Sequence, residues 1–111
     1  MVKMMSNEIE KKEYYCSLYD LYSSLLTIKQ QDYFEDYYFN DLSLFEIAAN
    51  YQVSRNAIYD QLQKVIKALE EYEEKLCLLK KEKKMNDILD EYQDSNNKEV
   101  LDLVSKLKNM E

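Results

Sequence analysis

The chain has 111 residues, which is enough for one small domain with an appendage. It contains neither glycine nor proline, and this argues against sheet-rich folds, because their tight turns depend on the backbone angles that these residues supply. The net charge of −7 opposes general attraction to nucleic acid, so any contact with phosphate has to be local. The chain has no histidine and no glycine-rich phosphate loop, so we expect no enzyme, no metal site and no cofactor.

The charge is distributed unevenly along the chain. Residues 1–53 carry a net charge of −5 and residues 85–111 a net charge of −4, whereas residues 54–84 carry +2. No apolar run approaches the ~20 residues that span a bilayer, and the sequence shows no signal peptide. We therefore expect a cytoplasmic protein without membrane insertion, in which Cys16 and Cys77 are reduced core thiols.

Two helices are predicted before residue 41. The first runs from about Asn7 to Leu25, because apolar residues recur there at spacings of three and four. The second begins after Thr27, which forms a capping-box pattern with Gln30. It ends near Asn40, the best candidate for a left-handed residue at that end in a chain without glycine.

A helix-turn-helix pattern follows. Ser43 and Glu46 form a second capping-box pattern, and the short helix that they start ends at a turn around Gln52. Related turns usually place glycine there, because the backbone tends to need a positive φ; glutamine adopts it at a cost of about 1 kcal/mol. Ser54 then caps the next helix.

The fourth helix is predicted to be long and to reach about residue 84. Its apolar residues are spaced alternately by four and three, as in a heptad stripe: Ile58, Leu62, Val65, Leu69, Tyr72, Leu76 and Leu79. The first half of this stripe packs on the preceding helices. The second half has no obvious cover upstream, so we expect it to meet the first helix, the C-terminal helix or a second copy of the protein. Its residues Leu69, Tyr72, Leu76 and Leu79 are the candidate interface for a protein partner or a homodimer.

We divide the chain into a helix-turn-helix bundle that includes the long fourth helix, residues 1–84, and a C-terminal helical tail, residues 85–111. The tail is expected to contain a helical piece over about Met85–Tyr92 and a break over 94–97. A last amphipathic segment follows the break, with Val100, Leu101, Val104 and Leu107 on one side. It is too short to be stable alone, so it needs a partner surface.

The fourth helix carries the candidate nucleic-acid contacts near its start. Arginine, asparagine and glutamine are the side chains that hydrogen-bond guanine and adenine edges, and lysines contact phosphate. The candidates are Ser54, Arg55, Asn56, Tyr59, Gln63, Lys64 and Lys67. Asp60 lies among them and repels phosphate, so an ordinary solvated helix face is the alternative interpretation.

A pattern from Leu26 to Asp60 resembles region four of bacterial sigma factors and, more closely, the YlxM-type bacterial helix-turn-helix proteins. Its most specific part is Ser54-Arg55-x-Ala57-Ile58-Tyr59-Asp60, and the rest is Leu26-Thr27, Gln30, Tyr33-Phe34, Tyr37-Tyr38, Asp41-Leu42-Ser43, Glu46-Ile47-Ala48 and Val53. The resemblance implies an all-α, sigma region-four-like bundle with a long fourth helix and a C-terminal helical extension.

The resemblance also implies a function. It points to a non-enzymatic accessory or regulatory protein of the signal recognition particle pathway, whose partner is a targeting GTPase. The alternative is a sequence-specific DNA-binding transcriptional regulator, a function that fold likeness alone suggests. A third alternative is binding of the particle's RNA through the basic run 80–84.

Overall fold

The computed structural model describes residues 6–110, and all the regular elements in this range are helices. The elements in chain order are α1 (Ser6–Tyr22), the 3-10 helix η1 (Ser23–Leu25), α2 (Ile28–Tyr38), α3 (Leu44–Tyr51), α4 (Arg55–Leu76), α5 (Leu78–Tyr92) and α6 (Lys98–Lys108). This confirms the predicted all-α fold class. The chain divides into two compact units, the first ending at Cys77 and the second beginning at Leu78.

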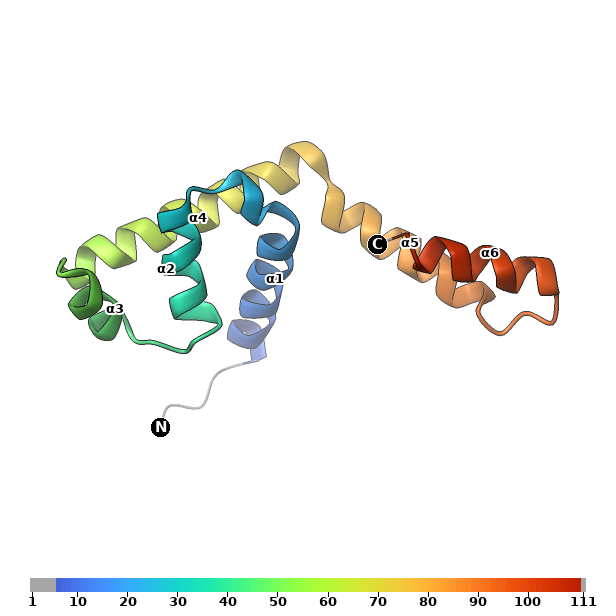
Figure 1. Cartoon of the computed structure of the whole chain (residues 1–111), viewed down its shortest axis with the longest axis horizontal. Helices are drawn as coiled ribbons and strands as arrows, with labels where there is room; N and C mark the ends of the chain where they lie inside the picture. Colours follow the sequence, from blue (N-terminus) through green and yellow to red (C-terminus); the bar gives the residue numbers. More distant parts are fainter. Residues whose placement is uncertain (1–5, 111) are drawn as a thin grey trace. The chain divides into compact units, whose positions relative to one another are not determined.

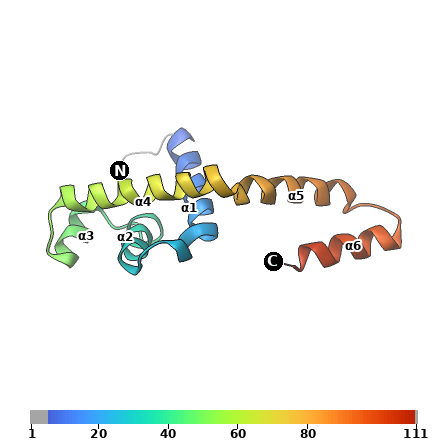
Figure 2. The same cartoon turned by 90° about the horizontal axis from the view of Figure 1, so that it is seen from above.

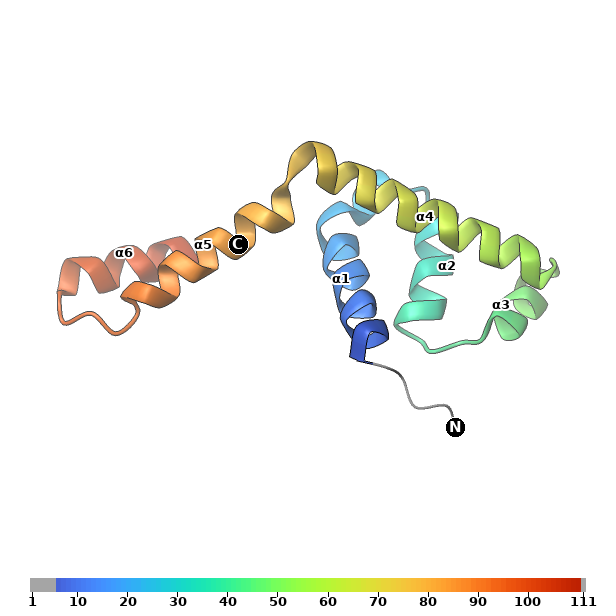
Figure 3. The same cartoon turned by 180° about the vertical axis from the view of Figure 1, so that it is seen from behind.

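In the first unit, α4 crosses α1 and α2, and α3 packs against its N-terminal end (Figures 1 and 3). All four helices contribute buried apolar side chains to this unit. The largest fully buried ones are Leu18, Tyr22, Phe34, Ile47, Ile58, Val65 and Leu69. The first half of the predicted heptad stripe therefore forms the face of α4 that holds the bundle together.

Aromatic rings join α1 to α2. Tyr19 of α1 stacks on Phe34 of α2 with ring centroids 4.3 Å apart, and its hydroxyl donates a hydrogen bond to Glu35. Burial and then this hydrogen bond raise the pKa of Tyr19. Tyr15 meets Tyr38 edge to face one turn earlier on α1. Pairs of this kind stabilise a core beyond their buried area.

The predicted helix starts are confirmed. Thr27 accepts a hydrogen bond from the backbone N–H of Gln30, whose side chain accepts one from the Thr27 N–H. Ser43 and Glu46 form the same reciprocal pair at the start of α3. Each box satisfies two backbone donors that the first turn of a helix leaves without partners.

The predicted left-handed residue after α2 is wrong by one position. Asp41, not Asn40, has the positive φ, at 54°. The backbone N–H groups of Phe39 and Asn40 both still bond to the carbonyl of Glu35, so the chain leaves the helical path only after them. Aspartate tolerates the left-handed region better than most residues other than glycine.

The prediction of one fourth helix reaching residue 84 is also wrong. α4 ends at Leu76, because Cys77 takes a left-handed conformation with φ 55° and ψ 30°. Its N–H closes the last turn of α4 on the carbonyl of Glu73 at 2.8 Å. The division between the units therefore falls after Cys77, earlier than the sequence pattern suggests, and Cys77 is a half-buried helix cap instead of a core thiol.

The second unit is a hairpin in which α5 and α6 run side by side in opposite directions (Figure 2). The predicted break over 94–97 is confirmed, and Asn97 caps α6 by accepting hydrogen bonds from the N–H groups of Glu99 and Val100. Leu89 of α5 and Val104 of α6 are buried. In the part of the chain that the structure covers, no helix has the length and apolar character needed to span a membrane.

Candidate nucleic-acid interface

The turn between α3 and α4 is short and left-handed. Gln52 has φ 56° and ψ 45°, which confirms the positive φ predicted from the sequence. The N–H of Val53 bonds back to the carbonyl of Ala48 at 3.0 Å, and the Ser54 hydroxyl accepts the N–H of Ala57 at 3.0 Å. These bonds end α3 and start α4 within three residues, which is the local geometry of a helix-turn-helix.

A separate cluster of buried residues lies beneath this turn. Tyr33 of α2 packs in it with residues of α3 and α4, namely Ile47, Ala48, Ile58 and Leu62. Tyr51 lies edge to face on Tyr33, with ring centroids 4.8 Å apart, and its hydroxyl donates to Asp36. The cluster fixes α3 against α4, so the first turns of α4 present their other face to solvent.

All seven predicted contact residues are exposed at the surface of the first unit. Four of them come together at the start of α4, where Ser54, Arg55, Asn56 and Tyr59 line an open hollow with Leu44 of α3. The Ser54 hydroxyl already serves as the helix cap. The structure thus groups the first four candidates and leaves the remaining ones, Gln63, Lys64 and Lys67, farther along the helix.

The start of α4, where the first candidate contacts lie, is almost neutral over residues 55–63. Arg55, Tyr59 and Gln63 recur every four residues and so share one face of α4. Between Arg55 and Gln63 the helix carries one positive charge and one negative charge, Asp60, and both side chains are exposed. Among the described residues Arg55 has no ion pair, so its guanidinium is available to a partner.

The predicted partner interface is divided between two helices, because Leu69, Tyr72 and Leu76 lie on α4 and Leu79 lies on α5 in the second unit. Leu69 is fully buried and Leu79 is 7% exposed. Tyr72 is half-buried, lies 5.9 Å from the Tyr22 ring between centroids, and donates its hydroxyl to the carbonyl of Leu25 at 3.3 Å. Leu76 is 45% exposed. On α4, α1 and the end of η1 cover Leu69 and Tyr72, so of the three covers left open by the sequence the structure shows the first helix.

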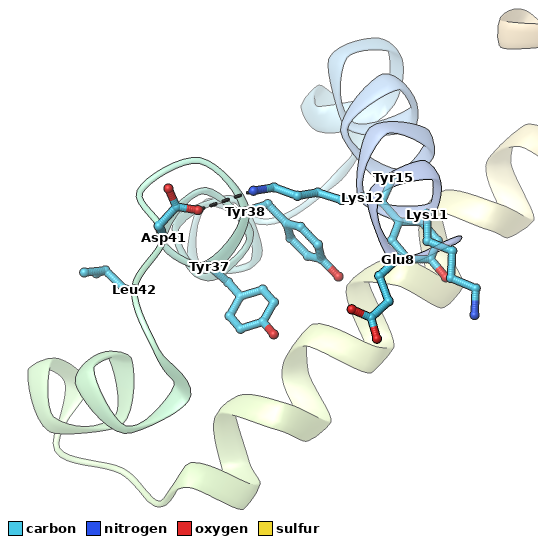
Figure 4. Close-up of a pocket in the computed structure, with 8 residues that line it drawn as sticks. All are labelled: Glu8, Lys11, Lys12, Tyr15, Tyr37, Tyr38, Asp41 and Leu42. Carbon is cyan, nitrogen blue, oxygen red and sulfur yellow. Dashed lines mark hydrogen bonds and ion pairs between the residues drawn. The ribbon is translucent and has the colours of Figure 1, made fainter. Parts of the chain in front are cut away.

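A second hollow, between α1 and the end of α2, was missed by sequence reasoning. Lys12 of α1 pairs with Asp41 after α2 at 3.3 Å and bridges the hollow, whose floor includes Tyr15 and Tyr38 (Figure 4). Burial raises the pKa of the Tyr38 hydroxyl. The lining residues come from separate segments with no shared motif, so the sequence has no pattern that groups them. Their charges are mixed, and residues 6–110 hold no cluster of three ligand-type side chains for a metal ion.

The first unit thus has the fold and turn geometry of a helix-turn-helix protein. The chain matches the family described as "Putative helix-turn-helix protein, YlxM / p13 like" over residues 9–110. It belongs to this family, and this confirms the resemblance found in the sequence.

Relatives from several bacteria support this assignment. A UPF0122 protein of Geobacillus sp. (strain WCH70) is 40% identical over 100 residues, which cover 85% of this chain and 91% of the relative. The UPF0122 protein YlxM of Bacillus subtilis (strain 168) is 56% identical over 64 residues, 58% of each chain. A UPF0122 protein of Ureaplasma urealyticum serovar 10 is 45% identical over 100 residues, covering 90% of this chain and 95% of the relative.

Proposed function

We propose that this chain is a non-enzymatic accessory protein of the signal recognition particle pathway, and that it binds a protein component of that machinery, a targeting GTPase. The family resemblance motivates the pathway. One observation favours a protein over nucleic acid as the partner: in a chain of net charge −7, residues 55–63 at the start of α4 carry no net charge, and the candidate cations Lys64 and Lys67 lie farther along the helix. Local positive charge supplies nearly all of the non-specific affinity of proteins for DNA or RNA and a large share of the specific affinity.

The second half of α4 supports the same proposal through its charge. Glu70, Glu71 and Glu74 are exposed there, and Lys75 is the cation near them on the helix. Acidic surfaces of this kind steer basic partners and set specificity more than they add affinity. A GTPase that meets this face therefore needs a basic patch of its own.

The test is a binding titration with purified components. The labelled chain is titrated with the targeting GTPase and, separately, with its receptor, at ~150 mM salt and after nuclease treatment. A variant with Glu70→Gln, Glu71→Gln and Glu74→Gln is expected to bind roughly tenfold more weakly. The matched control changes three exposed acidic residues of α1, Glu10→Gln, Glu13→Gln and Asp20→Asn, and is expected to keep wild-type affinity.

Three results would contradict the proposal. The first is no binding to either GTPase, and the second is an equal loss of affinity in both triple variants. The third is binding that nuclease abolishes. A nuclease-sensitive complex that needs the lysines of residues 80–84 but not Arg55 would instead identify the particle's RNA as the partner.

A sequence-specific DNA-binding regulator is the second candidate function, and one observation favours it. Arg55, Asn56 and Tyr59 lie together at the capped N-terminus of α4, where recognition helices contact base edges. For this function Arg55→Ala weakens binding, Asp60→Asn strengthens it, and affinity falls steeply with salt. The accessory function predicts that neither substitution changes affinity for the GTPase by more than about twofold.

A further inference from the structure

Helix α5 carries more apolar surface than α6 covers. Leu89 is buried, but Met85, Ile88 and Tyr92 are 45%, 54% and 51% exposed. These three residues are spaced by three and four, so they form one stripe beside Leu89 on the same helix. The stripe has the pattern of a helix that packs against a second helix along this side.

The second unit is too small to be stable by itself. It consists of residues 78–111, and a unit of fewer than ~40 residues usually needs a disulfide, a metal or another chain. Its described residues include only three buried side chains, Leu79, Leu89 and Val104, and its part of the sequence has no cysteine. The hairpin therefore needs an additional apolar surface to pack against.

The distribution of charge along α5 favours a second copy of the same helix as that additional surface. The first half of the helix holds four lysines and one glutamate over residues 80–84, and the second half with the following turn holds four acidic residues over 87–94. Two copies of α5 running in opposite directions place each basic half beside an acidic half, and they do so twice. A parallel pair would place like charges side by side. The charges of two α5 helices are therefore complementary only when the helices are antiparallel, related by a two-fold axis.

We propose that the α5–α6 hairpins of two copies of this chain pack into an antiparallel four-helix bundle, with the two α5 helices side by side. One register of the two α5 helices brings the apolar stripes together and also places opposite charges side by side. In this register Met85 lies against the partner's Ile88, and Lys84 lies beside the partner's Glu91. Neither Lys84 nor Glu91 has an ion pair within the described residues, and both are exposed. The interface is two-fold symmetric, so each contact occurs twice.

The first experiment measures mass by sedimentation equilibrium from micromolar to submillimolar concentration. The wild-type chain is expected to shift from 13.4 kDa toward twice that mass as concentration rises. Ile88→Glu places a charge in the apolar stripe and is expected to weaken dimerisation at least about a hundredfold. The control is Ile28→Glu, which changes an exposed isoleucine of the first unit and is expected to leave the mass curve unchanged.

The second experiment swaps charges at one predicted contact. Lys84→Glu and Glu91→Lys each place like charges together and are expected to weaken the dimer roughly tenfold. The double variant, Lys84→Glu with Glu91→Lys, restores opposite charges across the axis and is expected to return to wild-type affinity. Helix content by circular dichroism shows that each variant is folded.

The outcomes separate the dimer from its alternatives. A wild-type chain that stays at 13.4 kDa at every concentration overturns the proposal and means that the stripe is covered within one chain or by another protein. A dimer that Ile88→Glu does not affect places the interface elsewhere and also overturns it. If the double variant dimerises as weakly as the single variants, the proposed antiparallel register is overturned.

Discussion

Replacing Gln52 with glycine should stabilise the first unit. Gln52 has φ 56° and ψ 45° in the turn of the helix-turn-helix, and this conformation costs a residue with a Cβ about 1 to 2 kcal/mol. Glycine removes that cost but loses about 0.4 to 1 kcal/mol more entropy on folding. The net gain expected for Gln52→Gly is therefore about 0.8 kcal/mol in the free energy of unfolding from the middle of each range, within limits of about 0 and 1.6 kcal/mol, or a few degrees in Tm.

Gln63→Gly is the matched control for this experiment. Gln63 is exposed inside α4, where glycine in place of glutamine is expected to cost about 1 kcal/mol. Urea unfolding followed by tyrosine fluorescence is a suitable assay, because ten of the eleven tyrosines lie before Cys77 and so report on the first unit. If Gln52→Gly destabilises the unit as much as Gln63→Gly does, the turn is not left-handed and the reasoning is refuted.

Three further predictions concern the first unit. Tyr22→Phe removes the hydrogen bond that its hydroxyl donates to Glu73 at 2.7 Å, between α1 and α4, and should cost about 1 kcal/mol in urea unfolding at pH 7. Burial raises the pKa of the Tyr38 hydroxyl above the usual 10.0. The stability that the neutral hydroxyl contributes is therefore complete below pH 10 and is lost as the pH rises further. In Tyr38→Phe the unfolding free energy should fall less steeply above pH 10. Ser43→Ala and Ser54→Ala each remove a helix cap and should lower the unfolding free energy by about 1 kcal/mol, and an unchanged midpoint for either would show that its cap adds nothing.

The sequence predicted those parts of the fold that depend on neighbouring residues. The capping boxes at Thr27 and Ser43, the cap at Ser54 and the left-handed turn at Gln52 all follow from interactions within four residues. The exposed start of α4 follows in the same way, because its apolar spacing fixes which side faces the core. These local rules were sufficient to identify a helix-turn-helix and to place its candidate contact residues.

The features that the sequence did not predict depend on distant segments or on a single backbone angle. The heptad pattern continues through Cys77 without interruption, and nothing in its neighbours shows that Cys77 ends α4. For Leu69 and Tyr72 the sequence left three possible covers open, and the choice of α1 with η1 depends on segments that lie far from them in the sequence. The exposed stripe of α5 depends on a distant segment in the same way, because the packing of α6 buries Leu89 and leaves Met85, Ile88 and Tyr92 exposed.

The proposed dimer contacts and the candidate nucleic-acid contacts of α4 lie in different units, and this separates the two candidate functions experimentally. Ile88→Glu removes the second copy without changing any residue of the helix-turn-helix, and Arg55→Ala does the reverse. A DNA-binding regulator that contacts two half-sites through a dimer loses most of its affinity when the dimer is broken, because both recognition helices contribute to one complex. An accessory protein whose first unit binds one GTPase keeps its intrinsic affinity in the monomer. The affinity of Ile88→Glu for each ligand therefore distinguishes the two functions, whichever partner the wild-type chain binds more tightly.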